Sequence, residues 1–273
     1  MANGINWGKI YCNSWWGSDS NKDSLPTSEF DQCAVAPIPE GYQFSGYSEF
    51  SQAVNLWFSD NPSAISTYGE INTWGVSAVT FMQDIFLGRT TFNDDISNWD
   101  VSNVTTMAGM FQNTSFNQDI SAWNVGSVVD MRAMFYNTPF NQNISSWNVS
   151  RVDDMSFMFQ STPFNQDISA WDVSSVLEFF QTFSSNNVFN QDISSWDVSS
   201  ALTMNGMFID ATSFNQNIAS WNTGSVTNMD NMFRNAIVFN RDLSGWDVSG
   251  ILNNAYADFA TNTPAWTLPK PIF

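Results

Sequence analysis

Hydrophobic and polar residues follow one another along this chain in a pattern that returns at a nearly constant interval. The text FNQDISAWNVGSVVDMRAMFYNTP occupies residues 116–139, and closely similar text recurs six more times. The seven units begin at Phe92, Phe116, Phe140, Phe164, Phe189, Phe214 and Phe239, and successive starts are 24, 24, 24, 25, 25 and 25 residues apart. A fixed period between about 20 and 50 residues marks a repeat architecture. One supersecondary unit is therefore copied along an axis.

Each unit contains two hydrophobic periods. In the unit that begins at Phe92, Trp99 and Val101 have the period of two that is expected of a short strand. The apolar residues of the segment 104–111 follow at i, i+3, i+6 and i+7, which is one face of a short helix. Asn-Thr-Ser or Asn-Thr-Pro then predicts a turn before the next Phe-Asn. The pattern predicts coils of strand, short helix and turn.

The fold class that follows is an α/β solenoid of about eight strand–helix coils of 24–25 residues, with N- and C-terminal caps. We expect residues 1–45 to form an N-terminal cap or docking segment, 46–259 the repeat solenoid and 260–273 a C-terminal cap. Helical spacing of apolar residues over 48–60 predicts an amphipathic helix at the start of the stack. A divergent first coil begins near Ile71.

Residues 1–45 belong to no repeat and leave two interpretations open. Their aromatic side chains could cover the open end of the core, since terminal repeats need a cap, or could dock the protein to a larger assembly. These candidate docking residues are Trp7, Tyr11, Trp15 and Trp16. Cys12 and Cys33 form one disulfide or remain free thiols, and the composition does not decide between the two.

The charge and the residue types that are missing exclude several classes of function. A net charge of −18 argues against nucleic acid and against anionic membrane surfaces as partners. The chain has no His and only two Cys, which excludes His-dependent catalysis and a structural zinc site. The sequence contains no run of about 18 apolar residues, so it predicts no membrane-spanning helix. We see no signal peptide or anchor, and we expect no cofactor and no enzymatic activity.

One position of the repeat is asparagine in every unit and predicts a structural asparagine ladder. Its amides would pair with backbone groups at a tight bend and with the next coil, because buried backbone groups need partners. A row of amides that binds a ligand is the alternative. The ladder consists of Asn93, Asn117, Asn141, Asn165, Asn190, Asn215 and Asn240.

Two further columns contain Asp and Asn interchangeably, which indicates a need for a carbonyl-type acceptor in a cap or turn. Calcium between coils is the alternative, since hard cations favour clustered oxygen ligands. No metal site can be named. The first column is Asp95, Asp119, Asn143, Asp167, Asp192, Asn217 and Asp242. The second column is Asp100, Asn124, Asn148, Asp172, Asp197, Asn222 and Asp247.

The text FNQDISSWDVSSV followed by MxxMF resembles the repeat of the BspA-like surface-protein family, a leucine-rich-repeat relative with units of about 26 residues. The resemblance covers residues 46 to 259 and implies a leucine-rich-repeat-like solenoid. It also implies display on a surface and adhesion to host or partner molecules. The opening text NWGKIYCNSWWG is similar to short openings of phage structural proteins.

The function expected from the sequence is a non-enzymatic, surface-displayed structural or adhesion module that presents its coils to a protein or glycan partner. The alternative is a virion structural component, such as a capsid decoration, fibre or tail subunit, held to neighbouring subunits through its N-terminal segment. The location would be an extracellular surface or a virion. Four cations interrupt the repeat and are candidate partner contacts. They are Arg132, Arg151, Arg234 and Arg241.

Overall fold

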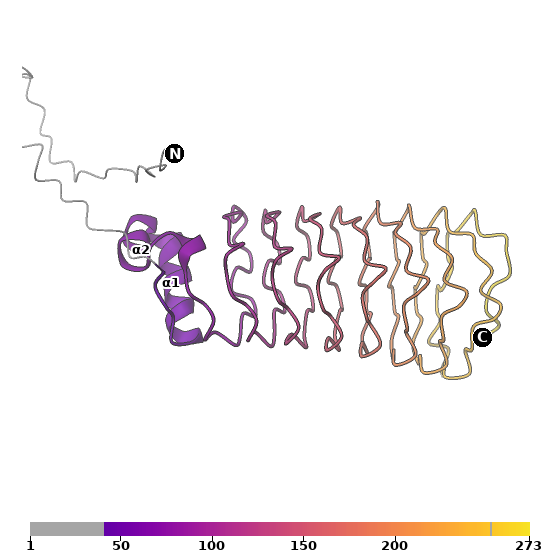
Figure 1. Ribbon diagram of the computed structural model, residues 1–273. Helices are drawn as coiled ribbons and strands as arrows, with labels where there is room; N and C mark the ends of the chain where they lie inside the picture. The colour runs from indigo at the N-terminus through magenta and orange to yellow at the C-terminus, as the bar shows by residue number, and fades with distance from the viewer. Residues whose placement is uncertain (1–40, 252) are drawn as a thin grey trace, which may run out of the picture.

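The protein is a row of stacked coils with two short helices at one end (Figure 1). The computed structural model describes residues 41–251 and 253–273. Helix α1 (Tyr47–Ser59) and helix α2 (Asn61–Tyr68) precede the first coil, and the 3₁₀ turn η2 (Ile71–Thr73) lies at its start. The expected docking aromatics and both cysteines lie outside the described residues.

The two helices form where the sequence supplies terminal partners for them. Glu49 lies in the first turn of α1, and its carboxylate accepts hydrogen bonds from the backbone N–H and the hydroxyl of Ser45 at 3.0 and 2.8 Å. Asp60 lies between the helices and accepts from the backbone N–H of Ser63 at 3.2 Å, as an N-cap does. Gly69 ends α2 with φ 81°. Phe50 and Val54 of α1 are buried against the first coils.

The expected α/β solenoid of strand–helix coils is wrong. In the described residues the coils contain no α-helix and no strand, and the helices α1 and α2 lie outside the repeat. Adjacent repeat coils are joined by isolated parallel bridges, and these do not fall on the predicted strand 99–101. The bridges run through Phe81, Thr106, Asp130, Asp154, Glu178, Thr203 and Asn228.

The segment 104–111 is not a helix because its amides point along the stack. The backbone N–H of Met107 donates to Asp130 at 3.0 Å, and that of Gly109 donates to Arg132 at 2.7 Å, both in the next coil. Each coil is folded locally by four-residue turns, such as the bond from Met110 N–H to the Met107 carbonyl at 3.1 Å. Successive turns bring every third or fourth residue inward, so they imitate helical spacing.

The turns also require backbone conformations that a right-handed helix forbids. Gly109 has φ 61° and Asn113 has φ 58°, and both are the third residue of a turn, where a type II turn needs positive φ. Glycine and asparagine adopt this region at the least cost. Positive φ recurs at the same two positions in the following coils, up to Asn231 and Asn235.

The core is a stack of aromatic rings. Phe111 lies 5.7 Å from Phe135 of the next coil at an interplanar angle of 13°, and it lies 3.9 Å from Phe116 beside it. A buried tryptophan completes each coil. Its indole N–H donates to an isoleucine carbonyl of the preceding coil, as Trp147 does to Ile120 at 3.2 Å. This bond satisfies the one polar group of a ring that is otherwise enclosed.

The stacking of parallel rings stops at both ends of the row. Phe58 of α1 meets Phe86 at 73°, with ring centroids 6.3 Å apart. At the other end Trp266 meets Phe233 at 80° and Phe239 at 77°. The carbonyls of residues 255–261 also accept from the amides of 229–235. These amides would otherwise have no acceptor, because no regular coil follows. Rings turned edge-on therefore close the core.

Replacing Phe159 with alanine should lower the free energy of unfolding by about 3–5 kcal/mol, because Phe159 is fully buried between rings of both neighbouring coils. Urea unfolding followed by tryptophan fluorescence measures this loss. Phe81→Ala is the matched control, since Phe81 is 38% exposed, and it should cost less than about 1 kcal/mol. Equal losses in the two variants would contradict the aromatic core described above.

Candidate interaction surface

The seven recurrent asparagines lie in one column and bond from coil to coil. The Asn93 Oδ1 accepts from the backbone N–H of Asn117 at 2.8 Å, and the same bond repeats along the column at 2.9 Å. At the end of the column, the Asn240 Oδ1 accepts from the N–H groups of Thr267 and Leu268 at 2.9 and 3.0 Å. In the described structure these amide oxygens are engaged within the chain.

A glutamine column next to the asparagines was missed in the sequence analysis. Each glutamine Nε2 donates to the backbone carbonyl of the asparagine in the preceding coil, at 2.7–3.1 Å. The column is Gln118, Gln142, Gln166, Gln191 and Gln216. Arg241 follows in the same column and donates from its guanidinium to the Asn215 carbonyl. The recurrence of Gln after Phe-Asn was the available signal.

The two Asp/Asn columns cap tight turns within their own coils. In every coil the Oδ1 accepts from the backbone N–H two residues further on, at 2.9–3.2 Å in the first column and 3.0–3.3 Å in the second. The Ser102 hydroxyl and its backbone N–H hold the pKa of Asp100 below its usual value. The Ser244 hydroxyl and N–H do the same for the pKa of Asp242. Within the described residues, no three Asp, Glu, Cys or His side chains are grouped as metal ligands.

The four candidate arginines occupy different environments. Arg132 lies between two carboxylates, with nitrogen–oxygen distances of 3.9 Å to Asp130 and 3.8 Å to Asp154. Arg234 donates to Asn231 at 3.5 Å, and Arg151 is exposed. Arg241 is part-buried in the glutamine column. The structure does not bring the four together into one patch around a shared contact.

A row of carboxylates is a second feature that the sequence analysis missed. Asp130, Asp154 and Glu178 are bridge partners in three successive coils, so like charges face one another across the stack. Burial, with a smaller contribution from neighbouring carboxylates, raises the pKa of Asp130. Burial and the charge of Asp154 raise the pKa of Glu178. Only the stacking of coils places these acids together, because they are 24 residues apart in sequence.

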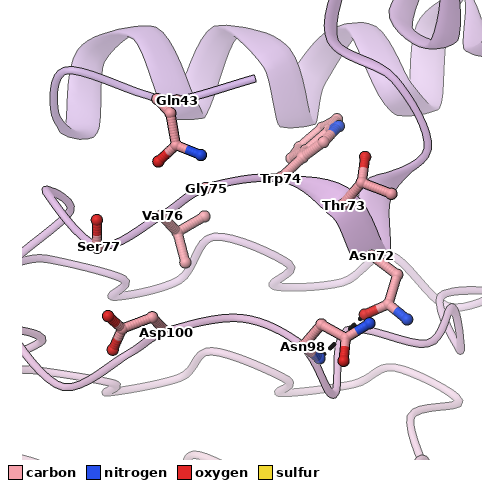
Figure 2. Close-up of a pocket in the computed structure, with 9 residues that line it drawn as sticks. All are labelled: Gln43, Asn72, Thr73, Trp74, Gly75, Val76, Ser77, Asn98 and Asp100. Atoms are coloured by element: carbon pink, nitrogen blue, oxygen red, sulfur yellow. Dashed lines mark hydrogen bonds between the residues drawn. The ribbon is translucent and has the colours of Figure 1, made fainter. Parts of the chain in front are cut away.

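A polar hollow of about 430 Å³ lies beside the first coil (Figure 2). Gly75 stands there at the position that the later coils fill with Asp or Asn, and the Gln43 amide occupies the vacated space. The Asn72 Oδ1 accepts from the backbone N–H of Asn98 at 3.0 Å, and Asp100 of the neighbouring coil also lines the hollow. The polar lining suits a ligand that carries hydroxyl or amide groups.

A family model described as "Mycoplasma protein of unknown function, DUF285" matches residues 52–167 and, again, residues 154–265. No curated protein and no solved structure matches the chain. The two overlapping matches together span every regular coil. Among the described residues no helix has both the length and the apolar character needed to cross a membrane.

Replacing Asn141 tests what the asparagine column contributes. The Asn141 Oδ1 accepts from the backbone N–H of Asn165 at 2.9 Å and from the Gln166 amide at 3.0 Å. Asn141→Ala leaves both donors without this acceptor and should lower the free energy of unfolding by about 1–3 kcal/mol. Asn141→Asp retains the acceptor and should lose less, as measured by urea unfolding at neutral pH. A larger loss in the aspartate variant would contradict an acceptor role.

Glu178→Gln should raise the melting temperature at pH 7 by roughly 1–2 °C, because the ionised Glu178 carboxylate is partly buried and lies beside Asp154. A raised pKa means that the folded state binds this proton more readily than the unfolded chain. Ionisation therefore lowers stability at neutral pH, and the penalty disappears as the pH falls through the folded pKa towards the ordinary glutamate value. The two proteins should melt together at about pH 3.5, below that value.

A matched control for this pH series is Asp197→Asn. The pKa of Asp197 is lowered by the Ser199 hydroxyl and backbone N–H, and other coils carry asparagine at the same position. This variant should gain no stability at pH 7. A melting temperature of Glu178→Gln that stays below that of the wild type at pH 7 would contradict a destabilising charge on Glu178.

Proposed function

We propose that this chain, which belongs to the family described as Mycoplasma protein of unknown function, DUF285, is a non-enzymatic structural module displayed on a surface. Its stacked coils present side chains to a protein or glycan partner or to neighbouring subunits of a larger assembly. The observation that carries this proposal is the repetition of the coil. Bridges and turn caps recur from coil to coil, so the exposed columns lie at a constant spacing along the row, whichever side chains they carry.

A non-enzymatic role is supported by how the acids are used. A general acid needs a raised pKa and a position opposite its partner group. The Asp side chains of the two turn columns accept bonds from their own coils, which lowers the pKa of Asp100, Asp197 and Asp242. The two acids with a raised pKa, Asp130 and Glu178, lie in one row with Asp154 between them. The chain also has no histidine to act as a base.

Display on a surface is supported by the family match, which is compatible with the resemblance to BspA-like surface repeats. Adhesion is the finer form of this proposal. Long stacks suit adhesion because stability comes from neighbouring coils, so outer side chains can vary without loss of the core. The partner then meets a surface whose scaffold is fixed and whose exposed residues are free to change.

Limited proteolysis of intact cells or particles that carry the tagged full-length protein tests the proposal. The coils should be released by protease added from outside, while an internal marker protein stays intact. The released or purified full chain should bind an array of immobilised proteins and glycans saturably, and heat-unfolded protein should not. Protection of the chain until the cells or particles are opened would overturn surface display.

Deletion of residues 1–45 in the same system separates two modes of attachment. If the truncated protein stays folded but no longer joins the surface or particle, this segment docks the coils to an assembly. If it joins as before, the coils themselves make the attachment. Circular dichroism and thermal melting of the truncated protein establish that it is folded before either result is interpreted.

A further inference from the structure

Apolar side chains interrupt the polar surface of the coils at several places, and one such group in the middle of the stack is here called the central patch. It consists of Phe157, Leu177, Phe180 and Leu202, carried by three successive coils. Leu177 and Leu202 are 37% and 43% exposed, and they are joined through the bond from Leu202 N–H to the Leu177 carbonyl at 2.8 Å. Phe157 and Phe180 lie 4.8 Å apart, edge-on at 80°, and both are half-buried.

The aromatic pair departs from what other coils carry in the same columns. The column of Phe157 is otherwise formed by small or polar residues, and so is the column of Phe180. The first column contains Asp84, Gly109, Ala133, Gln181, Gly206 and Asn231. The second contains Ala108, Arg132, Ser156, Asn205 and Asp230. The two phenylalanines are therefore not required to build a coil.

Phe157 is also held in a conformation that costs free energy. Its φ is 60°, and a bulky residue with positive φ is an outlier that persists where surrounding structure or function demands it. Glycine at positions 109 and 206 adopts the same φ of 61° and 62° without that cost. An aromatic ring kept at such a position, and left half outside the core, indicates a contact beyond the chain.

Carboxylates border the central patch and favour a partner of positive charge. Glu178 lies between Leu177 and Phe180 in sequence, and Asp154 is its bridge partner in the preceding coil. Asp153 precedes Leu177 in the same column, where its carbonyl accepts from the Leu177 N–H at 2.9 Å. Two cations belong to the same part of the stack. Arg132 pairs at 3.8 Å with Asp154, and the exposed Arg151 lies two residues before Asp153 in sequence. Negative charge therefore exceeds positive charge around the apolar residues.

We propose that the central patch binds a cationic protein segment in which lysine or arginine alternates with apolar side chains. This inference rests on the proposed function, for which it names the partner class and the surface. The apolar side chains cover Leu177, Leu202 and the aromatic pair, and the cations neutralise Asp153, Asp154 and Glu178. Relief of the repulsion between the stacked acids adds to the attraction. A second copy of this chain is a poorer occupant, because the net charge of −18 makes copies repel.

The probe is a synthetic peptide of alternating lysine and leucine, titrated calorimetrically into the full-length protein at low and at physiological salt. Saturable binding that weakens with salt is expected, as for other charge-assisted interfaces. A peptide of alternating lysine and serine should bind at least tenfold more weakly. A peptide of alternating glutamate and leucine should not bind.

Variants assign the binding to the central patch. Phe157→Asn with Phe180→Ser uses residues that other coils carry in the same columns, so the fold should be retained and the melting temperature should not fall. The affinity for the lysine–leucine peptide should fall at least tenfold. Asp154→Asn with Glu178→Gln should weaken binding at low salt about threefold and reduce its salt dependence. Ile237→Asn is the matched control, since Ile237 is 42% exposed outside the patch, and should bind as the wild type does.

Three outcomes would overturn the inference. The first is equal binding by the Phe157→Asn, Phe180→Ser variant and the wild type, and the second is equal affinity for the lysine–serine and lysine–leucine peptides. The third is a glycan on the array whose binding is lost in the same variant. If the protein is displayed and binds its surface partner while patch variants bind unchanged, the proposed function stands and this inference falls. If the peptide binds at the patch but the protein is shielded from external protease, the patch binds as inferred and the proposed surface display is wrong.

Discussion

The register between neighbouring coils is the constraint on which the rest of this structure depends. A single coil has no strand and no α-helix, and amides such as those of Met107 and Gly109 find their carbonyls only in the next coil. The same register places Phe111 over Phe135 and Phe135 over Phe159, at 5.7 and 5.9 Å. Backbone bonding and ring stacking therefore require one another. An insertion is tolerated only where the chain bends between coils, which is where the 25-residue units take up their extra residue.

This constraint decides which surface side chains are free to recognise a partner. The asparagine and glutamine columns bond to the preceding or following coil, and the Asp/Asn columns cap turns within each coil. Their polar groups are visible from outside, but part of their hydrogen-bonding capacity is already used. Recognition then falls to columns that vary from coil to coil. The columns of Phe157, Leu177 and Phe180 are among those that vary, from glycine and serine to large apolar residues.

The two ends of the stack show how a repeating core can stop. At an open end, the exposed face of the last ring could stack on the ring of another molecule. A row of unpaired amides could likewise pair with another coil. At the first coil, Phe58 of α1 lies edge-on to the rings of Phe86 and Phe92. At the last regular coil, Trp266 lies edge-on to Phe233, and residues 255–261 supply the missing carbonyls. The edge-on rings therefore prevent further stacking at each end, and the terminal segments also cover the core there.

The sequence by itself determined the repeat, its period and nearly all of the core. Phe, Ile, Trp, Val and Met recur at fixed spacing because each must meet its equivalent in the next coil, and residues such as Trp147 and Phe159 are buried as that spacing requires. Only the tertiary structure decided the backbone. A period of three and four is common to a helix and to successive turns, and the choice depends on whether Met107 and Gly109 donate within the segment or to the next coil. The tertiary structure also decided the position of Asp130, Asp154 and Glu178, which lie together only because the coils stack. Their proximity is a property of the register, which no local pattern of residues records.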